Sequence, residues 1–457
     1  MHLRAPLRER IRNWDGTQTW RPDTVHHPSS EAEVAAIIRQ AAERGGRVKA
    51  HGGSLSWSDI IDVPQAAMRL DRMARVLEVD PLAQRVTVQG GARLRDVNEA
   101  LAARGQAFDN FGSIVMQTAA GYTGTGTHGT GGRTRILSSH IERMRLVDGR
   151  GEIRELSATS EPELFAAARV HLGCLGVVTE ITFRTVDAFD LEERLELVDF
   201  DTALADLETH IAANDYFKLW WIPYTSKIQL YRFNRTTRPR TRQSFSEKLD
   251  TSGISGAAYT ALLGLSRHAP IIIPRLNETI QRFQFKARAR IDRSDRIIRV
   301  ATAIPVHQET EYAIPRVHAG AAIEEIRRFV ERASPRSSAS RSSRAAYHVN
   351  FPLEVRFVAA DDIPMGPASG RDSCYLGAYV ASEAWAVPYF ADFENLMADY
   401  AGRPHWGKTF TRTHRQMRQL YPEYDRFDAL RRAADPAGVF HNRFVDRVFA
   451  PEQSPAR

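Results

Sequence analysis

Residues 117–132 read QTAAGYTGTGTHGTGG, a run dominated by glycine, threonine and alanine. Two shorter runs of the same kind lie on either side of it, AHGGSLSWS (50–58) and LGCLGVVT (172–179). Residues without bulk let the backbone approach a ligand closely, and their N–H groups can hold phosphate oxygens. One such run is usually only a turn. Three in the same part of the chain predict a site for a dinucleotide.

The central run also contains a formal G-x-G-x-x-G pattern at Gly124, Gly126 and Gly129. A Rossmann site needs a buried strand before this pattern and an amphipathic helix after it. Here QTAAGYT precedes it and TGGRTRILSSH follows it, and neither has the required pattern. We therefore reject a Rossmann site at this position, and with it the direct case for NAD.

The segments around the three runs predict an α+β unit of about 185 residues. Ser30 and Glu33 form a capping box before a helix that ends at Gly45. Ser160 and Glu163 are expected to cap a later helix. The other expected elements are strands at 47–50, 74–80, 84–90 and 172–186, a helix at 92–105, and a hairpin at 143–156 that turns at Asp148-Gly149.

The second half is richer in strands and aromatic residues. Residues 217–236 alternate like a pair of half-buried strands. Strands are also expected at 347–358 and 373–380, and a helix at 389–402. Residues 237–275 read as a basic, irregular excursion, and SPRSSASRSSR (334–344) reads as a polar, partly disordered loop.

The bulk composition is that of an ordinary soluble protein of two or three domains. The net charge of +7 comes from 62 basic and 55 acidic residues. It would suit an anionic ligand, but acids and bases are interspersed, so a solvated surface is the favoured interpretation. No nucleic-acid motif accompanies the charge.

Cys174 and Cys374 are the only cysteines in the sequence, and they lie in very different segments. This excludes a disulfide scaffold and a cysteine metal site, so no metal is expected. Residues 1–16 lack the apolar region of a signal peptide, and no apolar run approaches the roughly 20 residues that span a bilayer. A cytoplasmic protein is expected.

The order of the three runs resembles the FAD-binding domain of the vanillyl-alcohol-oxidase-like flavoproteins. In that family the first run wraps the pyrophosphate, a Gly-Thr-His-Gly stretch follows the ribityl chain and flavin, and the third run passes the adenine. The resemblance implies that FAD contacts His51, Gly52, Gly53, Ser54, Leu55, Ser56, Gln117, Thr118, Gly121, Gly124, Thr125, Gly126, Thr127, His128, Gly129, Gly173, Gly176, Val177, Val178, His405 and Lys408.

The resemblance continues into the second half. Residues 218–236 are similar to the strand pair of the sugar-1,4-lactone oxidases. Three further segments resemble other motifs of that branch: LEVRFVAADD (353–362), RPHWGK (403–408) and DPAGVFHNRFV (435–445). The group implied comprises aldonolactone oxidases and dehydrogenases, with alditol oxidases as relatives. It implies a two-part FAD-binding domain (1–186) and a sheet-containing substrate domain (187–457), of which 403–457 returns to the flavin.

The activity implied is oxidation of a hydroxyl-bearing carbon of a sugar-1,4-lactone or a related carbohydrate. Hydride would pass to flavin N5, and oxygen or another acceptor would reoxidise the flavin. One departure concerns the flavin link. Many relatives carry a histidine in the first run that bonds covalently to FAD, but Leu55 occupies that position here. FAD is therefore expected to bind non-covalently, and His51, four residues earlier, should not substitute.

Glu354 and Arg356 are two residues apart on an expected strand, so both project from one face. Such a pair can accept from and donate to adjacent hydroxyls, and the resemblance places it against substrate near flavin N5. The alternative is a salt bridge facing solvent. Lys408 matches a family lysine near flavin and substrate, where its charge would stabilise reduced flavin. The alternative there is a surface lysine after a buried Trp406.

Two further residues carry weaker cases. His405 is as suited to packing as to catalysis. Tyr379 lies on a strand expected near the substrate. Alditol oxidases tend to have His and Thr where this chain has Gly377 and Tyr379, which weighs against an acyclic polyol.

Other interpretations stay open from the sequence. A larger glycosyl or natural-product alcohol could be admitted by residues 237–275. The fold could also serve a non-catalytic nucleotide or carbohydrate binder, or the chain could be an NAD(P)-linked enzyme. The sequence leaves open which sugar is oxidised, whether oxygen is the acceptor, and the oligomeric state.

Overall fold

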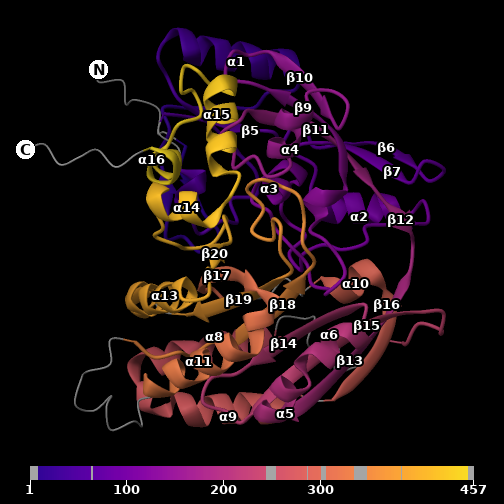
Figure 1. Cartoon of the computed structure of the whole chain (residues 1–457), viewed down its shortest axis with the longest axis vertical. Coiled ribbons are helices and arrows are strands. Elements are labelled where there is room, and N and C mark those ends of the chain that lie inside the picture. The colour runs from indigo at the N-terminus through magenta and orange to yellow at the C-terminus, as the bar shows by residue number, and fades with distance from the viewer. Residues whose placement is uncertain are drawn as a thin grey trace, which may run out of the picture.

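The computed structural model describes residues 9–62, 65–242, 254–285, 287–299, 305–333, 347–381 and 383–450. Two α+β halves lie one above the other, with the N-terminal half at the top of Figure 1 and the large sheet of the second half below it. The expected polar loop at 334–344 lies outside the described residues, as do residues 243–253 of the expected excursion.

The described residues of the N-terminal half form two larger sheets and two two-stranded ones. A parallel sheet has the order β3-β5-β4 (Thr24–His26, Ala66–Arg69, Val48–His51). An antiparallel sheet has the order β10-β9-β11-β7-β6 (Ile153–Ser157, Ile141–Val147, Val177–Arg184, Arg85–Gln89, Val76–Asp80). Its helices are α1 (Glu31–Glu43), α2 (Leu94–Ala102), α3 (Ala119–Gly124) and α4 (Pro162–Ala168). The two-stranded sheets are β1-β2 (Ile11–Arg12, Thr19–Trp20) and β12-β8 (Val186–Asp187, Gln106–Ala107).

Local sequence explains how α1 begins. The Ser30 hydroxyl accepts a hydrogen bond from the amide of Glu33, which satisfies one of the free donors of the first turn. The expected capping box is only half right, because the Glu33 carboxylate accepts from the amide and hydroxyl of Ser29 instead of from Ser30. Val34, Ala35 and Ile38 then bury one face of the helix.

The hairpin of β9 and β10 turns through residues 148–152, which contain the expected Asp148-Gly149. Gly149 there packs against Asp435 and donates to Ala434. Two expectations for local structure are wrong. Glu161, with φ of 51° and no side-chain cap, precedes α4, so Ser160 is not its cap. Helix α3 forms within the central small-residue run, and residues 254–268 form a helix inside the expected irregular excursion.

The second half is built on one eight-stranded sheet, with the order β16-β13-β15-β14-β18-β19-β17-β20. The strands are β13 (Asp190–Asp199), β14 (Tyr216–Trp221), β15 (Lys227–Thr236), β16 (Arg288–Arg293), β17 (Gln308–Pro315), β18 (Leu353–Val358), β19 (Ser373–Val380) and β20 (Arg403–Pro404). Strand β18 is shorter than the expected 347–358. The helices are α5 (Phe200–Ala205), α6 (Leu207–Ala213), α8 (Ile254–His268), α9 (Ile273–Gln284), α10 (Ser294–Ile298), α11 (Ala319–Arg332) and α13 (Glu383–Ala398).

The two faces of this sheet have opposite chemistry, because side chains alternate along a strand. Leu353, Val355 and Phe357 of β18 are buried within the main hydrophobic core, as expected, together with Ile323 and Ile326 of α11. The even-numbered residues of β18 project from the other face. Glu354 and Arg356 are therefore fixed on the face opposite the apolar core.

The C-terminal segment leaves β20 and returns to the N-terminal half, where α14 (His414–Leu420), α15 (Tyr424–Ala434) and α16 (Arg443–Phe449) lie beside the earliest residues in Figure 1. The amide of Val48 donates to Val439 at 2.8 Å. The Asn442 side-chain amide donates to the Asp62 carbonyl at 3.0 Å. These contacts fix the strand that leads into the first small-residue run.

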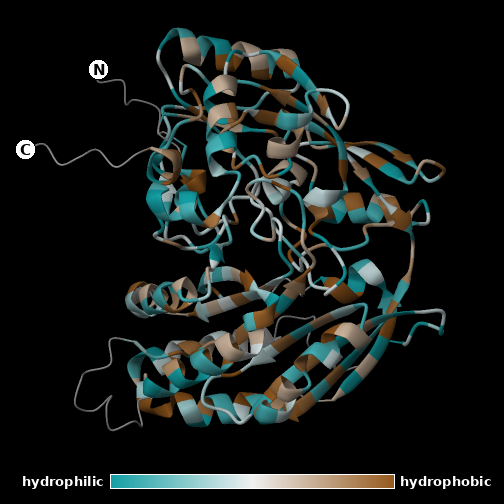
Figure 2. Cartoon of the chain, viewed as in Figure 1, coloured by the Kyte–Doolittle hydropathy of each residue, from teal (hydrophilic) through white to brown (hydrophobic). Residues whose placement is uncertain are grey.

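Apolar and polar residues alternate along the helices and strands in Figure 2, without one continuous apolar band. Of the helices in the described ranges, none combines the length and apolar character that a bilayer span requires.

Candidate active site

The three small-residue runs meet in the structure. A Cβ at Gly52 would lie 2.4 Å from the Thr118 hydroxyl, so the first run touches the central one. A Cβ at Gly124 would lie 2.6 Å from the His171 ring, and the Leu172 amide donates to Gly124 at 2.9 Å, so the third run touches it as well. The runs therefore require small residues in part because they pack closely against one another.

The first run also presents unpaired backbone donors. The amides of residues 53–56 form no hydrogen bond with any other residue in the described part of the chain. Ser54 has φ of 54°, which turns the backbone sharply at this point. Successive unpaired N–H groups in a turn make an anion-binding concavity. The run thus fits the pyrophosphate of FAD.

His51 takes no part in that concavity. Its Nε2 donates to the Ile61 carbonyl at 2.9 Å, and its Nδ1 contacts the Ser54 hydroxyl at 3.1 Å. Burial lowers the pKa of His51 to about 4, so the ring is neutral. The ring is committed to holding the turn.

The central run is ordered by its own hydroxyls. Thr118 caps α3 by accepting from the Gly121 amide, and the hydroxyls of Thr125 and Thr127 lie 3.0 Å apart. Gln117 donates to the Thr127 hydroxyl at 3.3 Å. Gly126 has φ of 63°, and a Cβ at Gly129 would lie 2.0 Å from the Asn110 side chain. No larger residue fits there.

The third run needs glycine for backbone reasons, since Gly173 and Gly176 have φ of 63° and 156°. Val177 and Val178 then begin β11. The buried Lys49 ammonium donates to the Gly173 carbonyl at 3.0 Å, and burial lowers its pKa to about 8. The sequence analysis missed this lysine, whose single signal was a cation at the centre of an expected strand.

The loop that contains Lys408 joins the two halves. The Trp57 amide donates to Gly407 at 2.8 Å, and the Ser58 hydroxyl donates to Trp406 at 2.6 Å. On its other side, the Thr409 amide donates to Glu309 of β17 at 3.0 Å. Lys408 is therefore no free surface residue. Its ammonium lies 4.5 Å from the Trp57 ring centroid and forms an ion pair with Glu309.

Glu354 lies at the centre of the polar face of the large sheet. Lys218, Trp220 and Arg356 donate to its Oε1 at 2.9, 2.7 and 2.9 Å, and Tyr379 donates to its Oε2 at 3.0 Å. Burial alone would raise the pKa of Glu354, but the charges of Arg356 and Lys218 outweigh it and hold the pKa well below its usual value. Glu354 and Arg356 do form a salt bridge with each other, as the alternative interpretation required. The salt bridge is buried, however, and does not face solvent.

Arg356 keeps donors to spare. Its Nη2 reaches the Ser113 hydroxyl at 3.0 Å as well as Glu354. Its Nε is buried and has no hydrogen-bond partner among the described residues. A buried, unpaired guanidinium donor is costly, so this position suits a polar ligand.

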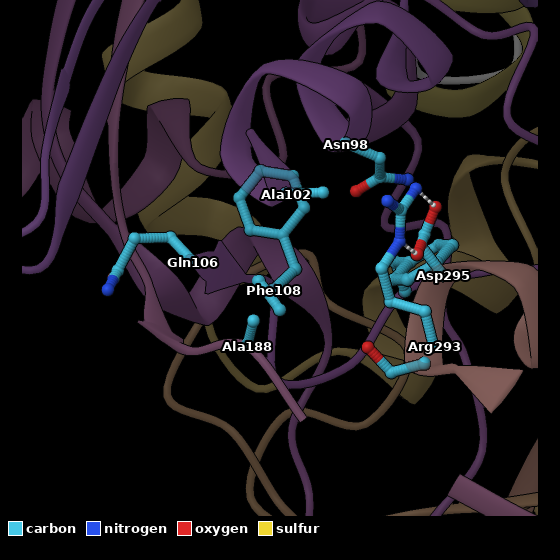
Figure 3. Close-up of a pocket in the computed structure, with 10 residues that line it drawn as sticks. Asn98, Ala102, Gln106, Phe108, Ala188, Arg293 and Asp295 are labelled. Atoms are coloured by element: carbon cyan, nitrogen blue, oxygen red, sulfur yellow. Dashed lines mark hydrogen bonds and ion pairs between the residues drawn. The ribbon is translucent and has the colours of Figure 1, made fainter. Parts of the chain in front are cut away.

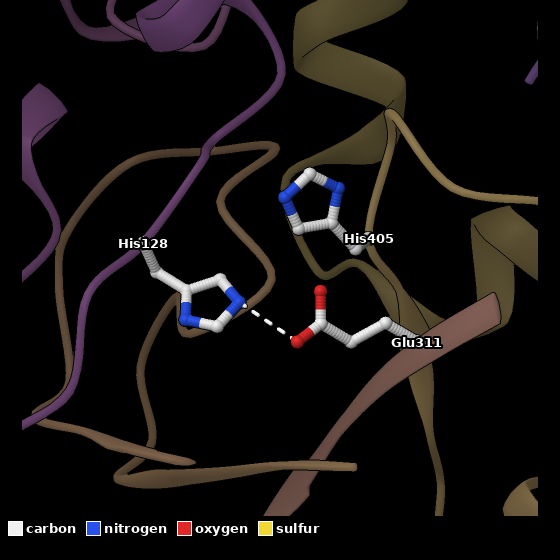
Figure 4. A group of neighbouring side chains, drawn as sticks. All are labelled: His128, Glu311 and His405. Carbon is white, nitrogen blue, oxygen red and sulfur yellow. Dashed lines mark hydrogen bonds and ion pairs between the residues drawn. The ribbon is translucent and has the colours of Figure 1, made fainter. Parts of the chain in front are cut away.

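His128, Glu311 and His405 form a buried group beside this face (Figure 4). His128 Nδ1 faces the Gly129 carbonyl at 2.9 Å, its Nε2 faces Glu311 Oε1 at 3.1 Å, and its ring stacks on Tyr375 at 3.6 Å. Both partners of the ring, the Gly129 carbonyl and the Glu311 carboxylate, are acceptors. Burial would raise the pKa of Glu311, but His128 outweighs it and lowers that pKa.

His405 completes the group in its neutral form. Its Nδ1 accepts from the Gly407 amide at 3.0 Å, and burial lowers its pKa to about 3. Two histidines and a carboxylate are also side chains that bind zinc. Hydrogen bonds already account for both nitrogens of His128 and for Nδ1 of His405, so we assign no metal to this group.

A separate cavity of about 10 Å³ lies where α2 meets the start of the second half, and Asn98, Phe108 and Arg293 help to line it (Figure 3). Its volume suits about one water molecule. None of the predicted site residues lines it, so it is not the substrate site.

The structure thus brings together Glu354, Arg356, Tyr379 and Lys408, with His128 and His405 beside them. It adds residues that sequence reasoning missed: Ser113, Lys218, Trp220, Glu309 and Glu311. The available signal was alternation, because Lys218 and Trp220, like Glu309 and Glu311, are polar residues two apart on otherwise buried strands.

Comparison with known proteins gives matches over nearly the whole chain. The D-arabinono-1,4-lactone oxidase family matches residues 181–448, and the FAD binding domain family matches residues 22–157. L-gulono-1,4-lactone dehydrogenase of Mycobacterium tuberculosis is 35% identical over 96% of this chain and 99% of its own length. L-gulonolactone oxidase of Scyliorhinus torazame is 31% identical over 96% of this chain and 97% of its own. D-arabinono-1,4-lactone oxidase of Eremothecium gossypii is 36% identical over 60% of this chain and 52% of its own.

Among solved structures, cholesterol oxidase from B. sterolicum superposes with a TM-score of 0.79 over 96% of each chain, at 16% identity. At that identity the likeness concerns the fold alone, and it agrees with the two-part FAD-binding architecture expected from the sequence.

Proposed function

The chain belongs to the D-arabinono-1,4-lactone oxidase family, and from this membership we propose that it is an FAD-dependent oxidoreductase that oxidises a hydroxyl-bearing carbon of a sugar-1,4-lactone. The observation that carries the proposal is the meeting of three elements. These are the small-residue runs, the Lys408 loop and the polar face around Arg356. They come from distant parts of the chain, and in the structure they adjoin one another.

We propose that FAD is held without a covalent bond. Its pyrophosphate would lie at residues 51–56, its ribityl chain and flavin along 117–129, and its adenine side at 172–178. The unpaired amides of residues 53–56 support the first placement. Leu55 supports the absence of a covalent link, because its side chain has no nucleophile. His51 cannot take that role while it bonds to Ile61.

When bound, FAD supplies the hydride acceptor, which no amino-acid side chain can provide. The chain's own residues orient the substrate. Arg356 offers its free donors to the ring oxygen or a hydroxyl of the lactone, while Glu354 fixes Arg356 and Tyr379 in place. The Lys408 ammonium favours the accumulation of negative charge beside the flavin.

We propose 1–186 as the FAD-binding domain and 187–457 as the substrate domain, with 403–457 returning to the flavin. The contacts of Val439 and Asn442 with the first half support that return. The buried free thiols of Cys174 and Cys374 suit a reducing, cytoplasmic setting. The electron acceptor is oxygen or another small oxidant.

The test uses the purified yellow protein under anaerobic conditions. A panel of 1,4-lactones, alditols and aromatic alcohols is added, and the flavin absorbance is followed. Bleaching by lactones, and not by alditols, supports the proposal. Bleaching by alditols or aromatic alcohols alone would reassign the substrate, and a colourless protein that takes up no FAD would exclude a flavoenzyme.

A further inference from the structure

Around Arg356 and Lys408, the polar face of the large sheet holds three buried carboxylates that differ in how many donors surround them. A fourth buried carboxylate on this face, Glu193, pairs with Arg288 and Arg290 of the outermost strand. Four side chains donate to Glu354, which has room for about four. Glu311 Oε1 lies 3.1 Å from His128 Nε2, and the charge of His128 lowers the pKa of Glu311, which makes this carboxylate a weak base. Glu309 has Lys408 as its single hydrogen-bond donor within the described ranges. Of the three, Glu309 alone combines an unfilled carboxylate oxygen with a raised pKa.

Glu309 also lies at the right place on the face. Its Cα partner on β19 is Tyr379, and Tyr379 in turn donates to Glu354. Strand β19 separates the strands of Glu309 and Glu354, so two strand spacings, about 10 Å, lie between the two residues. Glu309 and Lys408 thus lie on the same face as Arg356, one strand beyond Tyr379.

We propose that Glu309 is the proton acceptor of the oxidation, a role that rests on the proposed function. The substrate O–H bond breaks, and its proton passes to a free carboxylate oxygen of Glu309. The neighbouring C–H bond breaks, and its electron pair leaves with the hydrogen as a hydride to FAD, so that the carbon becomes a carbonyl. Glu309 later returns the proton to water, and Lys408 keeps the carboxylate in position throughout.

The electrostatics of the face agree with this role. Burial raises the pKa of Glu309 to about 7, which Lys408 opposes and Glu311 and Glu354 reinforce. A base with such a pKa is half ionised near neutral pH and suited to proton transfer. The charged and titratable groups that face it are Lys408, His405, Glu311, Tyr379, Glu354, Arg356 and His307.

The other candidates on this face are committed elsewhere. His405 is neutral and accepts from Gly407, and the two nitrogens of His128 face Gly129 and Glu311. Burial and the charges of Glu309 and Glu354 raise the pKa of Tyr379 well above its usual value. Tyr379 therefore stays protonated, which leaves it a donor.

The kinetic experiment uses the holoenzyme and a lactone that bleaches it. Anaerobic flavin reduction is followed by stopped flow between about pH 5.5 and 9, a range that brackets the useful pKa of a general base. The wild-type rate should rise with pH through about 7. Glu309→Gln should be about 100-fold slower or more at high pH and should lack that rise, since general-base catalysis contributes roughly 10²–10⁴-fold. Glu309→Asp should keep the rise at an intermediate rate.

Asp361→Asn is the matched control. Burial also raises the pKa of Asp361 to about 6, but Asp361 faces Gly366 and the Ile363 amide rather than the polar face. Its pH profile should equal that of the wild type. A flat wild-type profile, or a Glu309→Gln variant that reduces flavin at the wild-type rate, overturns the role of Glu309.

A second readout needs no turnover. In the cofactor-free protein, the infrared band of a protonated carboxylic acid should titrate near neutral pH in the wild type and in Asp361→Asn. Glu309→Gln should lose the component that titrates near 7 and keep the one near 6 that Asp361 contributes. If Glu309→Gln does not fold, Asp361→Asn still decides, because the lack of a band that titrates near 7 in that variant excludes the raised pKa of Glu309. If no lactone bleaches the wild type, the proposed function fails while the infrared titration still reports on Glu309.

Discussion

At the scale of single residues, Glu354 depends on two cations, and the unforeseen one is Lys218. Its ammonium is buried, donates to Glu354 at 2.9 Å and lies 5.0 Å from the Trp220 ring centroid. Lys218→Met should leave FAD bound and lower kcat/KM by roughly 10- to 150-fold, which corresponds to a charge-assisted hydrogen bond of about 1.5–3 kcal/mol.

Lys227→Met is the control for this prediction. Lys227 lies on the adjoining strand β15, half-buried, and its side chain forms no ion pair with the described residues. It should retain normal kinetics. Equal kinetics in both variants would show that Arg356 alone is enough to orient Glu354.

Leu55 makes the second prediction at this scale. An alkyl side chain cannot bond to the flavin, and the neighbouring histidine is held by Ser54 and Ile61. Acid precipitation of the purified protein should release all of its yellow colour into the supernatant. Flavin fluorescence that stays with the denatured polypeptide would contradict non-covalent binding.

At the scale of elements, sequence patterns succeeded where a local signal determines the structure. The Ser30 cap, the alternation of 217–236 and the strand pattern of 347–358 each predicted an element that the structure contains, although β18 begins only at Leu353. Helix α3 was missed because a run rich in glycine and threonine has low helix propensity. It forms because Gly90 and Ala92, distant in sequence, accept from its first amides.

The residues of the candidate site also fall into two groups, those that a local sequence pattern predicts and those that it does not. Glu354 and Arg356 are found from strand alternation and Lys408 from a motif, so both were within reach of the sequence. Lys408 pairs with Glu309, 99 residues away in the sequence, and Lys218 pairs with Glu354, 136 residues away. Such contacts depend on strand order, and no local pattern determines that order.

The contact between two small-residue runs gives a prediction for elements. A Cβ at Gly52 would lie 2.4 Å from the Thr118 hydroxyl, which caps α3, so Gly52→Ala must displace one run from the other. Overpacking of this kind costs about 1–3 kcal/mol. We expect a lower melting temperature and weaker FAD binding in a fluorescence titration.

The control for Gly52→Ala is Gly320→Ala in α11, where an added Cβ meets nothing within 4 Å. That change should be neutral or should stabilise the helix by up to about 1 kcal/mol. Unchanged FAD affinity in Gly52→Ala would show that the contact between the runs does not shape the cofactor site.

At the scale of the whole molecule, buried histidines set the response to acid. Burial lowers the pKa of His51, His171 and His307 to about 4 and that of His405 to about 3. In the unfolded chain these rings titrate near 6.5. Between these values the unfolded state binds more protons than the folded state, so stability rises with pH. Glu309 and Asp361 act in the opposite direction, because their raised pKa values make the folded state bind the extra proton.

Burial also raises the pKa of Glu180 and Asp435, but it lowers the pKa of five further histidines, so acid should be destabilising overall: His26, His140, His210, His348 and His441. A pKa lowered from 6.5 to about 4 corresponds to about 3 kcal/mol for each ring once the pH falls below both values. We expect the melting temperature to fall steadily from about pH 6.5 to 4.5, with net proton uptake on unfolding when calorimetry is repeated in buffers of different ionisation enthalpy. His171→Gln should weaken this dependence, whereas His268→Gln, at the exposed end of α8, should preserve it. A melting temperature that stays constant across this range, or net proton release, would show that the buried rings are not neutral in the folded protein. The neutral state inferred for His51 and His405 at the site would then fail with them.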